Sequence, residues 1–124
     1  MDVPTAKTAT GYLLSAALCA QGIRCILDPL NASADYGIPA SPQTTNYEYV
    51  PVMGARNVAL GLCVGTFMFQ RERRAAGTVL CTALLIGAFD TWATFKHQGK
   101  WRGSVLSHAI GDGVFAGAGC WLTR

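Results

Sequence analysis

The sequence predicts an all-α fold, an integral-membrane four-helix bundle with a long loop between helices 1 and 2, in a single domain over residues 1–124. Charged residues make up only 14% of the chain, against about 25% in an ordinary soluble domain. Four apolar stretches of 18 to 21 residues approach the roughly 20 residues that a helix needs to cross a bilayer. They cover residues 10–27, 52–70, 75–95 and 105–122. A soluble four-helix bundle is rejected, because it needs a polar outer stripe that these stretches lack.

The first stretch is followed by a long segment, residues 28–51, that contains Pro29, Pro39, Pro42 and Pro51. This proline content excludes a spanning helix, and long loops of this kind tend to be functional lids or disordered. The motif "NYEYVP" at 46–51 supplies aromatic and acidic groups, so we expect this loop to fold back over the bundle.

The remaining connections are short, which predicts antiparallel neighbours. "RERR" at 71–74 is a tight hairpin, and "KHQGKWRGS" at 96–104 is a short basic loop. Two glycine pairs, Gly61 with Gly65 and Gly113 with Gly117, have the small-xxx-small spacing that allows close helix packing.

Several kinds of site have no sequence signature in this chain. No glycine-rich turn precedes a lysine with serine or threonine, as a phosphate-binding loop requires. The five cysteines show no metal-binding spacing. The net charge is only +3, and the basic residues stand at helix ends as interfacial anchors. We therefore expect no cofactor, no metal and no nucleic-acid partner.

The polar residues inside the predicted helices lie at similar depths. At 1.5 Å per residue they fall within roughly 10 Å of one membrane surface. They are Arg24, Arg56, Asn57, Asp90, His108 and Asp112. Ionisable groups avoid lipid, so we expect them to line one inward cavity. A purely structural set of Arg–Asp clasps is the alternative, but such clasps have no need to gather at one depth beneath a long loop.

Two carboxylates near an arginine suit concerted acid–base catalysis, with one carboxylate taking a proton and the other carboxylic acid donating one. Epoxide opening needs this combination, and so does isomerisation of a double bond in a lipid-like substrate. Composition and spacing leave the two open.

Four stretches also carry a resemblance to a known family. They are "GARNVALGLCVGTF", "RERRAAGTVL", "GAFDTWATFKHQGKW" and "HAIGDGVFAGAGCW". Over about residues 8–122 the chain resembles a fungal family of small four-helix integral-membrane proteins catalogued as a domain of unknown function. Some members are epoxide hydrolases of polyene-pyrone polyketide pathways of the aurovertin and citreoviridin type. The resemblance implies a catalytic site formed by Arg56, Asn57, Asp90, His108 and Asp112.

By chemistry and not by fold, this set is similar to the Asp-Arg-Asp array of limonene-type epoxide hydrolases. We expect Asp112 to be the base and Asp90 the acid, with His108 and Asn57 orienting water; a nucleophilic Asp forming a covalent ester is the competing mechanism. The expected substrate-binding residues are Arg24, Asp28, Tyr47, Tyr49 and Trp92.

The expected function is a membrane-embedded epoxide hydrolase or cyclase that converts epoxides of a fungal polyketide into diols or cyclic ethers. The alternatives are a lipid or terpenoid isomerase and a non-catalytic membrane scaffold for pathway enzymes. Expected partners are an apolar small molecule and membrane lipid, and a homo-oligomer stays open. Basic residues favour cytosolic termini, with the polar cluster on the lumenal side of the endoplasmic reticulum membrane.

Overall fold

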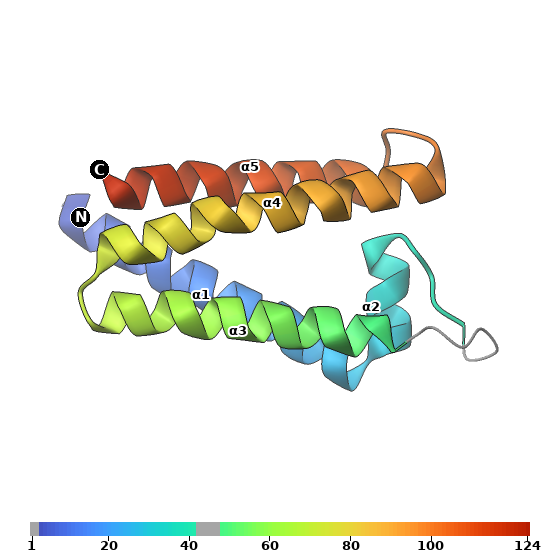
Figure 1. Cartoon of the computed structure of the whole chain (residues 1–124), viewed down its shortest axis with the longest axis horizontal. Helices are drawn as coiled ribbons and strands as arrows, with labels where there is room; N and C mark the ends of the chain where they lie inside the picture. Colours follow the sequence, from blue (N-terminus) through green and yellow to red (C-terminus); the bar gives the residue numbers. More distant parts are fainter. Residues whose placement is uncertain (1–2, 42–47) are drawn as a thin grey trace.

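The computed structural model describes residues 3–41 and 48–124, and these residues form five α-helices (Figure 1). The helices are α1 (Val3–Leu27), α2 (Pro29–Tyr36), α3 (Tyr49–Phe69), α4 (Arg73–Gln98) and α5 (Ser104–Thr123). The all-α class is confirmed. The four long helices contain the four predicted stretches, except that α3 ends one residue earlier than expected. The short helix α2 was not expected.

The four long helices are arranged as two antiparallel pairs. Helix α1 packs mainly against α3, and α4 packs mainly against α5. Figure 1 shows the α1–α3 pair below the α4–α5 pair, with both chain ends and the α3–α4 turn at one end. Helix α2 and the α4–α5 loop lie at the other end. A buried cluster that includes Leu18, Val64 and Leu80 joins the two pairs.

Glycine brings the helix backbones together within each pair. A Cβ atom on Gly22 would lie 2.5 Å from the Gly54 carbonyl oxygen, and one on Gly77 would lie 2.6 Å from that of Gly119. Real side chains do not tolerate such distances, so both seams require glycine.

The two predicted glycine pairs have different outcomes. Gly61 and Gly65 pack against α1, where an added Cβ would meet Ser15 or Cys19. Gly113 and Gly117 face open space, so their predicted role in helix packing is wrong. Helix α5 contacts α4 through the face that carries Gly119.

Three of the helices, α1, α3 and α4, are long and apolar enough to cross a membrane. Large apolar side chains point outward from them, including Leu13, Leu62 and Leu85. In water such a surface would be unusual for a monomeric protein, whereas in a bilayer it faces lipid. These helices are typical of an integral membrane protein.

Helix α2 replaces the first part of the predicted loop. Pro29 stands at its first turn and Gly37, with φ 96°, terminates it in the left-handed conformation. Proline at the first helical position and glycine after the last are favoured arrangements. The prediction of a loop was wrong here because proline was treated only as a helix breaker.

Interactions of Ser33 and Tyr49 hold the chain after α2 against the bundle. The buried Ser33 hydroxyl donates to Leu30 O at 2.7 Å and accepts from Ala40 N at 2.9 Å. The Tyr49 hydroxyl donates to Ile38 O at 2.7 Å. As a result, α2 is fixed across the end of the bundle.

Candidate active site between the helix pairs

A cavity of about 310 Å³ lies between the helix pairs near α2. It is lined by the six polar residues that share a depth in the sequence, Arg24, Arg56, Asn57, Asp90, His108 and Asp112. Their predicted gathering around one cavity therefore agrees with the structure. Apolar side chains, among them Leu60, Ile86 and Phe115, complete the lining. We call this space the polar cavity.

Arg56 of α3 and Asp90 of α4 form an ion pair across the cavity. Arg56 Nη2 lies 2.9 Å from Asp90 Oδ2, and the side chains are 33% and 21% exposed. Charge-assisted hydrogen bonds of this type are shorter and stronger than bonds between neutral groups. Arg56 Nε is buried and has no hydrogen-bond partner in the described part of the chain.

Asp112 of α5 has a different environment. The Thr91 hydroxyl of α4 donates to Asp112 Oδ2 at 2.9 Å. A Cβ atom on Gly87 would collide with the Asp112 carboxyl group, so the absence of a side chain at Gly87 creates the space for this carboxyl group. Among the described residues no ion pair joins Arg56 to Asp112. The predicted array, with Arg56 between two aspartates, is therefore formed on the Asp90 side only.

Tyr36, the last residue of α2, brings a phenol to the Asp90 side of the polar cavity. Burial raises the pKa of Tyr36, and the nearby Asp90 carboxylate, with which the phenol interacts, raises it further. Both effects disfavour the phenolate. Tyr36 therefore remains a neutral hydroxyl at physiological pH and can donate a hydrogen bond.

His108 connects α5 to α2. Its Nε2 atom lies 3.0 Å from Tyr36 O, and the two rings meet edge to face with centroids 4.4 Å apart. A carbonyl oxygen only accepts, so this geometry assigns the proton to Nε2. In the neutral ring, Nδ1 is then an acceptor.

The end of α2 is also held by Gln98. Its Nε2 atom donates to Gly37 O at 3.2 Å and to Ser104 Oγ at 2.6 Å. Together with His108, this contact holds the end of α2 beside the polar cavity, which Asp35 and Tyr36 line.

The expected substrate-binding residues are only partly placed at the cavity. Arg24 lines it and forms an exposed ion pair with Asp35 of α2. Asp28 is a correction, since it does not line the cavity; it is exposed and accepts from Asn31 Nδ2 at 2.9 Å. Its position directly after α1 places it at the start of α2 and outside the bundle.

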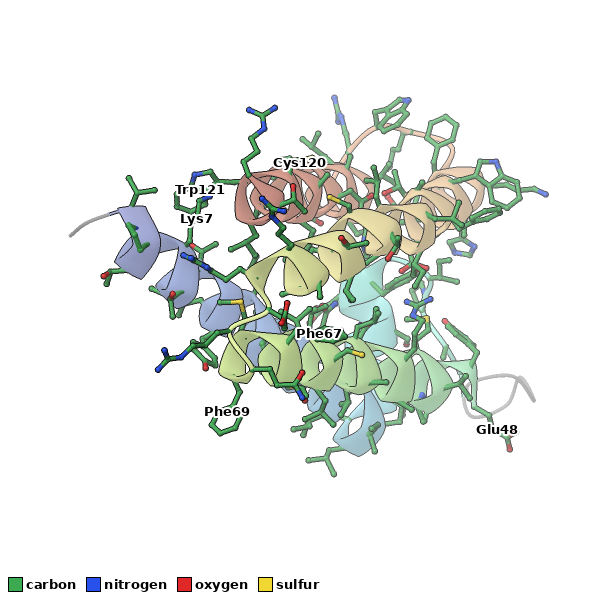
Figure 2. All side chains as sticks on the ribbon, turned by 60° about the vertical axis from the view of Figure 1, so that its left-hand side comes forward. Lys7, Glu48, Phe67, Phe69, Cys120 and Trp121 are labelled. Carbon is green, nitrogen blue, oxygen red and sulfur yellow. The ribbon has the colours of Figure 1, made fainter. Side chains whose placement is uncertain are left out.

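The loop and the tryptophan require further correction. Tyr49 is used in the contact with Ile38 and does not line the polar cavity. Figure 2 shows Glu48 pointing away from the bundle. Tyr47 lies outside the described residues. Trp92 is 56% exposed and packs against Phe89 with Lys96 above its ring, so it faces away from the cavity.

Two residues that line the cavity, Asp35 and Tyr36, and the hydrogen-bond partner of Asp112, Thr91, were missed in the sequence. Asp35 and Tyr36 lie within the segment interpreted as a loop, although the Asp28–Pro29 start and the Gly37 end are signals of a short helix. Thr91 follows Asp90 directly, but a search limited to ionisable residues overlooks a hydroxyl that positions a carboxyl group.

Metal binding has no evident ligand set in the described ranges. Within residues 3–41 and 48–124, no three His, Cys, Asp or Glu side chains gather closely enough to hold a metal ion. The chemistry available to the polar cavity is that of its carboxyl, guanidinium, phenol and imidazole groups.

Comparison with known families gives a match that covers residues 15–122. The family is described as "Domain of unknown function (DUF4267)". No curated protein and no solved structure matches the chain.

Proposed function

This chain belongs to the DUF4267 family, and we propose that it is a membrane-embedded epoxide hydrolase or ether-forming cyclase. The observation that supports this proposal is the pairing of two differently held carboxyl groups in one cavity. Asp90 is ion-paired to Arg56, whereas Asp112 is bonded to the Thr91 hydroxyl. Such a difference is what an acid and a base acting together require.

In the proposed reaction the Asp90 carboxylate accepts a proton from water, or from a hydroxyl group of the substrate. The oxygen of this nucleophile forms a bond to one epoxide carbon as the carbon–oxygen bond of the ring breaks. The epoxide oxygen takes a proton from the carboxylic acid form of Asp112. Return of one proton from Asp90 to Asp112 restores the starting state.

These roles are the reverse of those expected from the sequence. We propose Asp90 as the base because it forms the ion pair with Arg56. Asp112 has a hydroxyl partner, and a hydroxyl can bond to a carboxylate or to a carboxylic acid.

The substrate class follows from the walls of the polar cavity and from its position. Apolar side chains surround the polar groups, and the three helices α1, α3 and α4 suit a bilayer. We propose that α5, which packs along α4, spans the membrane as well. An epoxide on a hydrocarbon chain would reach the cavity from lipid. Because the chain resembles the fungal family described above, polyene epoxides of polyketide origin are the first compounds to test.

The membrane and orientation are part of the proposal. Lys7, Arg71, Arg73, Arg74 and Arg124 stand at the end that carries the chain termini, and Lys96, Lys100 and Arg102 stand at the other. The excess of basic residues favours a cytosolic position for the termini. The polar cavity would then face the lumen of the endoplasmic reticulum.

The test uses microsomes that contain the protein, incubated with a polyene epoxide in water labelled with oxygen-18. Hydrolysis gives a labelled diol, whereas cyclisation gives an unlabelled cyclic ether with the mass of the epoxide. Microsomes with the Asp90→Asn protein should lose the product, and those with Asp28→Asn, which changes a carboxylate outside the polar cavity, should keep it. Equal product formation in microsomes without the protein would refute the proposal.

A further inference from the structure

A second cavity, of about 420 Å³, lies at the end of the bundle that carries the chain termini. Five of its lining residues are basic, and they come from separate parts of the sequence: Lys7, Arg71, Arg73, Arg74 and Arg124. Glu72 is the only acidic side chain among the described lining residues. We call this space the basic cavity.

With five basic side chains and one acidic side chain among its described lining residues, the basic cavity has a net positive charge. None of its five cationic side chains takes part in an ion pair within the described parts of the chain, and Glu72 forms none either. By contrast, Arg24 and Arg56, at the polar cavity, are each paired with an aspartate. A group of unpaired cations produces a positive potential that attracts an anion.

The start of α4 adds to this potential. Glu72 precedes the helix but makes no side-chain hydrogen bond that would cap it. The first N–H groups of a helix have no partner within the helix, and they favour a negative charge nearby. Arg73 and Arg74 begin α4, so this helix start lies beside the cationic side chains of the basic cavity.

An apolar groove of about 710 Å³ adjoins the basic cavity. The two spaces share Pro4, Arg71 and Arg73, while the rest of the groove includes Ala9, Tyr12, Met68 and Phe69. Phe69 is 81% exposed and points outward from the end of α3 (Figure 2). The groove runs between α1 and α3 on a surface that suits lipid.

A positive site that continues into an apolar groove matches an anion with a hydrocarbon tail. We infer that this end of the bundle binds an anionic phospholipid, with the phosphate in the basic cavity and an acyl chain in the apolar groove. Lys7 is also positioned over the ring of Trp121, 5.9 Å from its centroid, and Figure 2 shows the two side chains together. Tryptophan at this level is typical of the membrane interface.

This site is separate from the proposed reaction. It occupies the opposite end of the bundle from the polar cavity, and it requires only that the helices lie in a membrane. The chemistry of the phosphate is shared by a lipid headgroup and a soluble phosphate ester, but only the lipid explains the groove.

The experiment measures lipid retention by native mass spectrometry of the purified protein in detergent. Phosphatidylglycerol and phosphatidylcholine are added separately, and glycerol 3-phosphate serves as the soluble phosphate. The test variant is Arg71→Asn/Arg73→Gln/Arg74→Gln; asparagine is chosen because Arg71 has φ 63°, which asparagine tolerates. The matched control, Lys96→Gln/Lys100→Gln/Arg102→Gln, removes the same charge from the other end.

We expect the protein to prefer phosphatidylglycerol, and the test variant to bind it about tenfold or more weakly. A tenfold change corresponds to about 1.4 kcal/mol, which is a modest effect for the loss of three basic residues that face an anionic lipid. The control variant should keep the preference. An equal loss in both triple variants would show a simple effect of net charge and would overturn the inference, as would equal retention of the two lipids by the unchanged protein.

A second variant keeps every charge and fills the groove. Ala9→Trp should weaken phosphatidylglycerol binding about tenfold. If the triple test variant does not fold, Ala9→Trp alone tests whether the lipid binds at this site. Unchanged lipid binding in Ala9→Trp would overturn the assignment of the acyl chain. Displacement of the lipid by glycerol 3-phosphate at a similar concentration would overturn the inference of a lipid ligand and would indicate a soluble phosphate ester.

Discussion

Arg56 Nη2 lies 2.9 Å from Asp90 Oδ2, which joins the α1–α3 pair to the α4–α5 pair inside the polar cavity. The same contact is suited to catalysis and to structural support. These two roles predict different results when the carboxyl group is changed.

Asp90→Asn and Asp112→Asn should each lower turnover of an epoxide by ~10² or more, the usual scale of general acid–base catalysis. Asparagine keeps the shape of the side chain but neither accepts nor donates a proton in this way. Turnover is measured on purified protein that has passed a thermal unfolding control. The double variant should be little worse than the worse single one, because the two groups act together.

A purely structural role gives the opposite pattern. Asp90→Asn would then leave Arg56 without its ionised partner and lower stability by about 1 kcal/mol or more, while folded molecules would remain active. Near-normal turnover in both folded single variants would remove the acid–base mechanism and favour the scaffold alternative.

Gly87→Ala should reduce turnover by about tenfold or more, because its new methyl group collides with the Asp112 carboxyl group. The collision should displace Asp112 from Thr91, and small displacements of reacting groups have large effects on rate. Gly113→Ala is the matched control, since it adds the same methyl group to α5 in open space. Equal turnover in the two variants would show that the position of Asp112 is unimportant.

Gly77→Ala should lower the free energy of unfolding by about 1 to 3 kcal/mol, the usual range for overpacking. Its methyl group would lie 2.6 Å from the Gly119 carbonyl oxygen, at the seam between α4 and α5. Gly117→Ala should be neutral or slightly stabilising, because it meets no neighbour and alanine favours helix. Both are compared by thermal unfolding in one detergent; an unaffected Gly77→Ala protein would contradict the tight seam.

Tyr36→Phe should change the alkaline stability of the protein. The folded state raises the pKa of Tyr36, so the stability associated with its neutral form is complete below about pH 10, the ordinary tyrosine pKa. It is lost as the pH rises above that value, because unfolding then releases a proton. The free energy of unfolding, measured in denaturant, should fall less between pH 8 and pH 11 for Tyr36→Phe than for the unchanged protein. Equal losses would mean that Tyr36 does not titrate with folding.

The hydropathy pattern predicts the four long helices because each apolar stretch is close to the length of a bilayer crossing. Depth along those stretches also predicts which polar groups share the polar cavity. Depth does not give direction: Trp92 lies at the level of Asp90, but two residues on a helix turn by about 200°, so Trp92 faces outward. The helical period would have excluded it.

The remaining errors depend on contacts that hydropathy does not contain. Gly113 and Gly117 have the spacing of packing glycines, but which face of α5 meets α4 is decided by the partner glycine, Gly77. Helix α2 is short and of mixed polarity, so its existence depends on local end signals and on the docking of Gly37 against Gln98 and Ser104.

The polar cavity is lined by an exposed ion pair as well as by apolar side chains, and this combination affects the kinetics of the proposed reaction. The exposed Arg24–Asp35 pair lines one part of the polar cavity, where water can reach it, whereas Leu60, Ile86 and Phe115 line another part. Water and a hydrocarbon substrate would thus arrive from two different phases. The rate should then follow the mole fraction of epoxide in the bilayer, so adding empty vesicles at constant total epoxide should slow turnover by dilution in two dimensions.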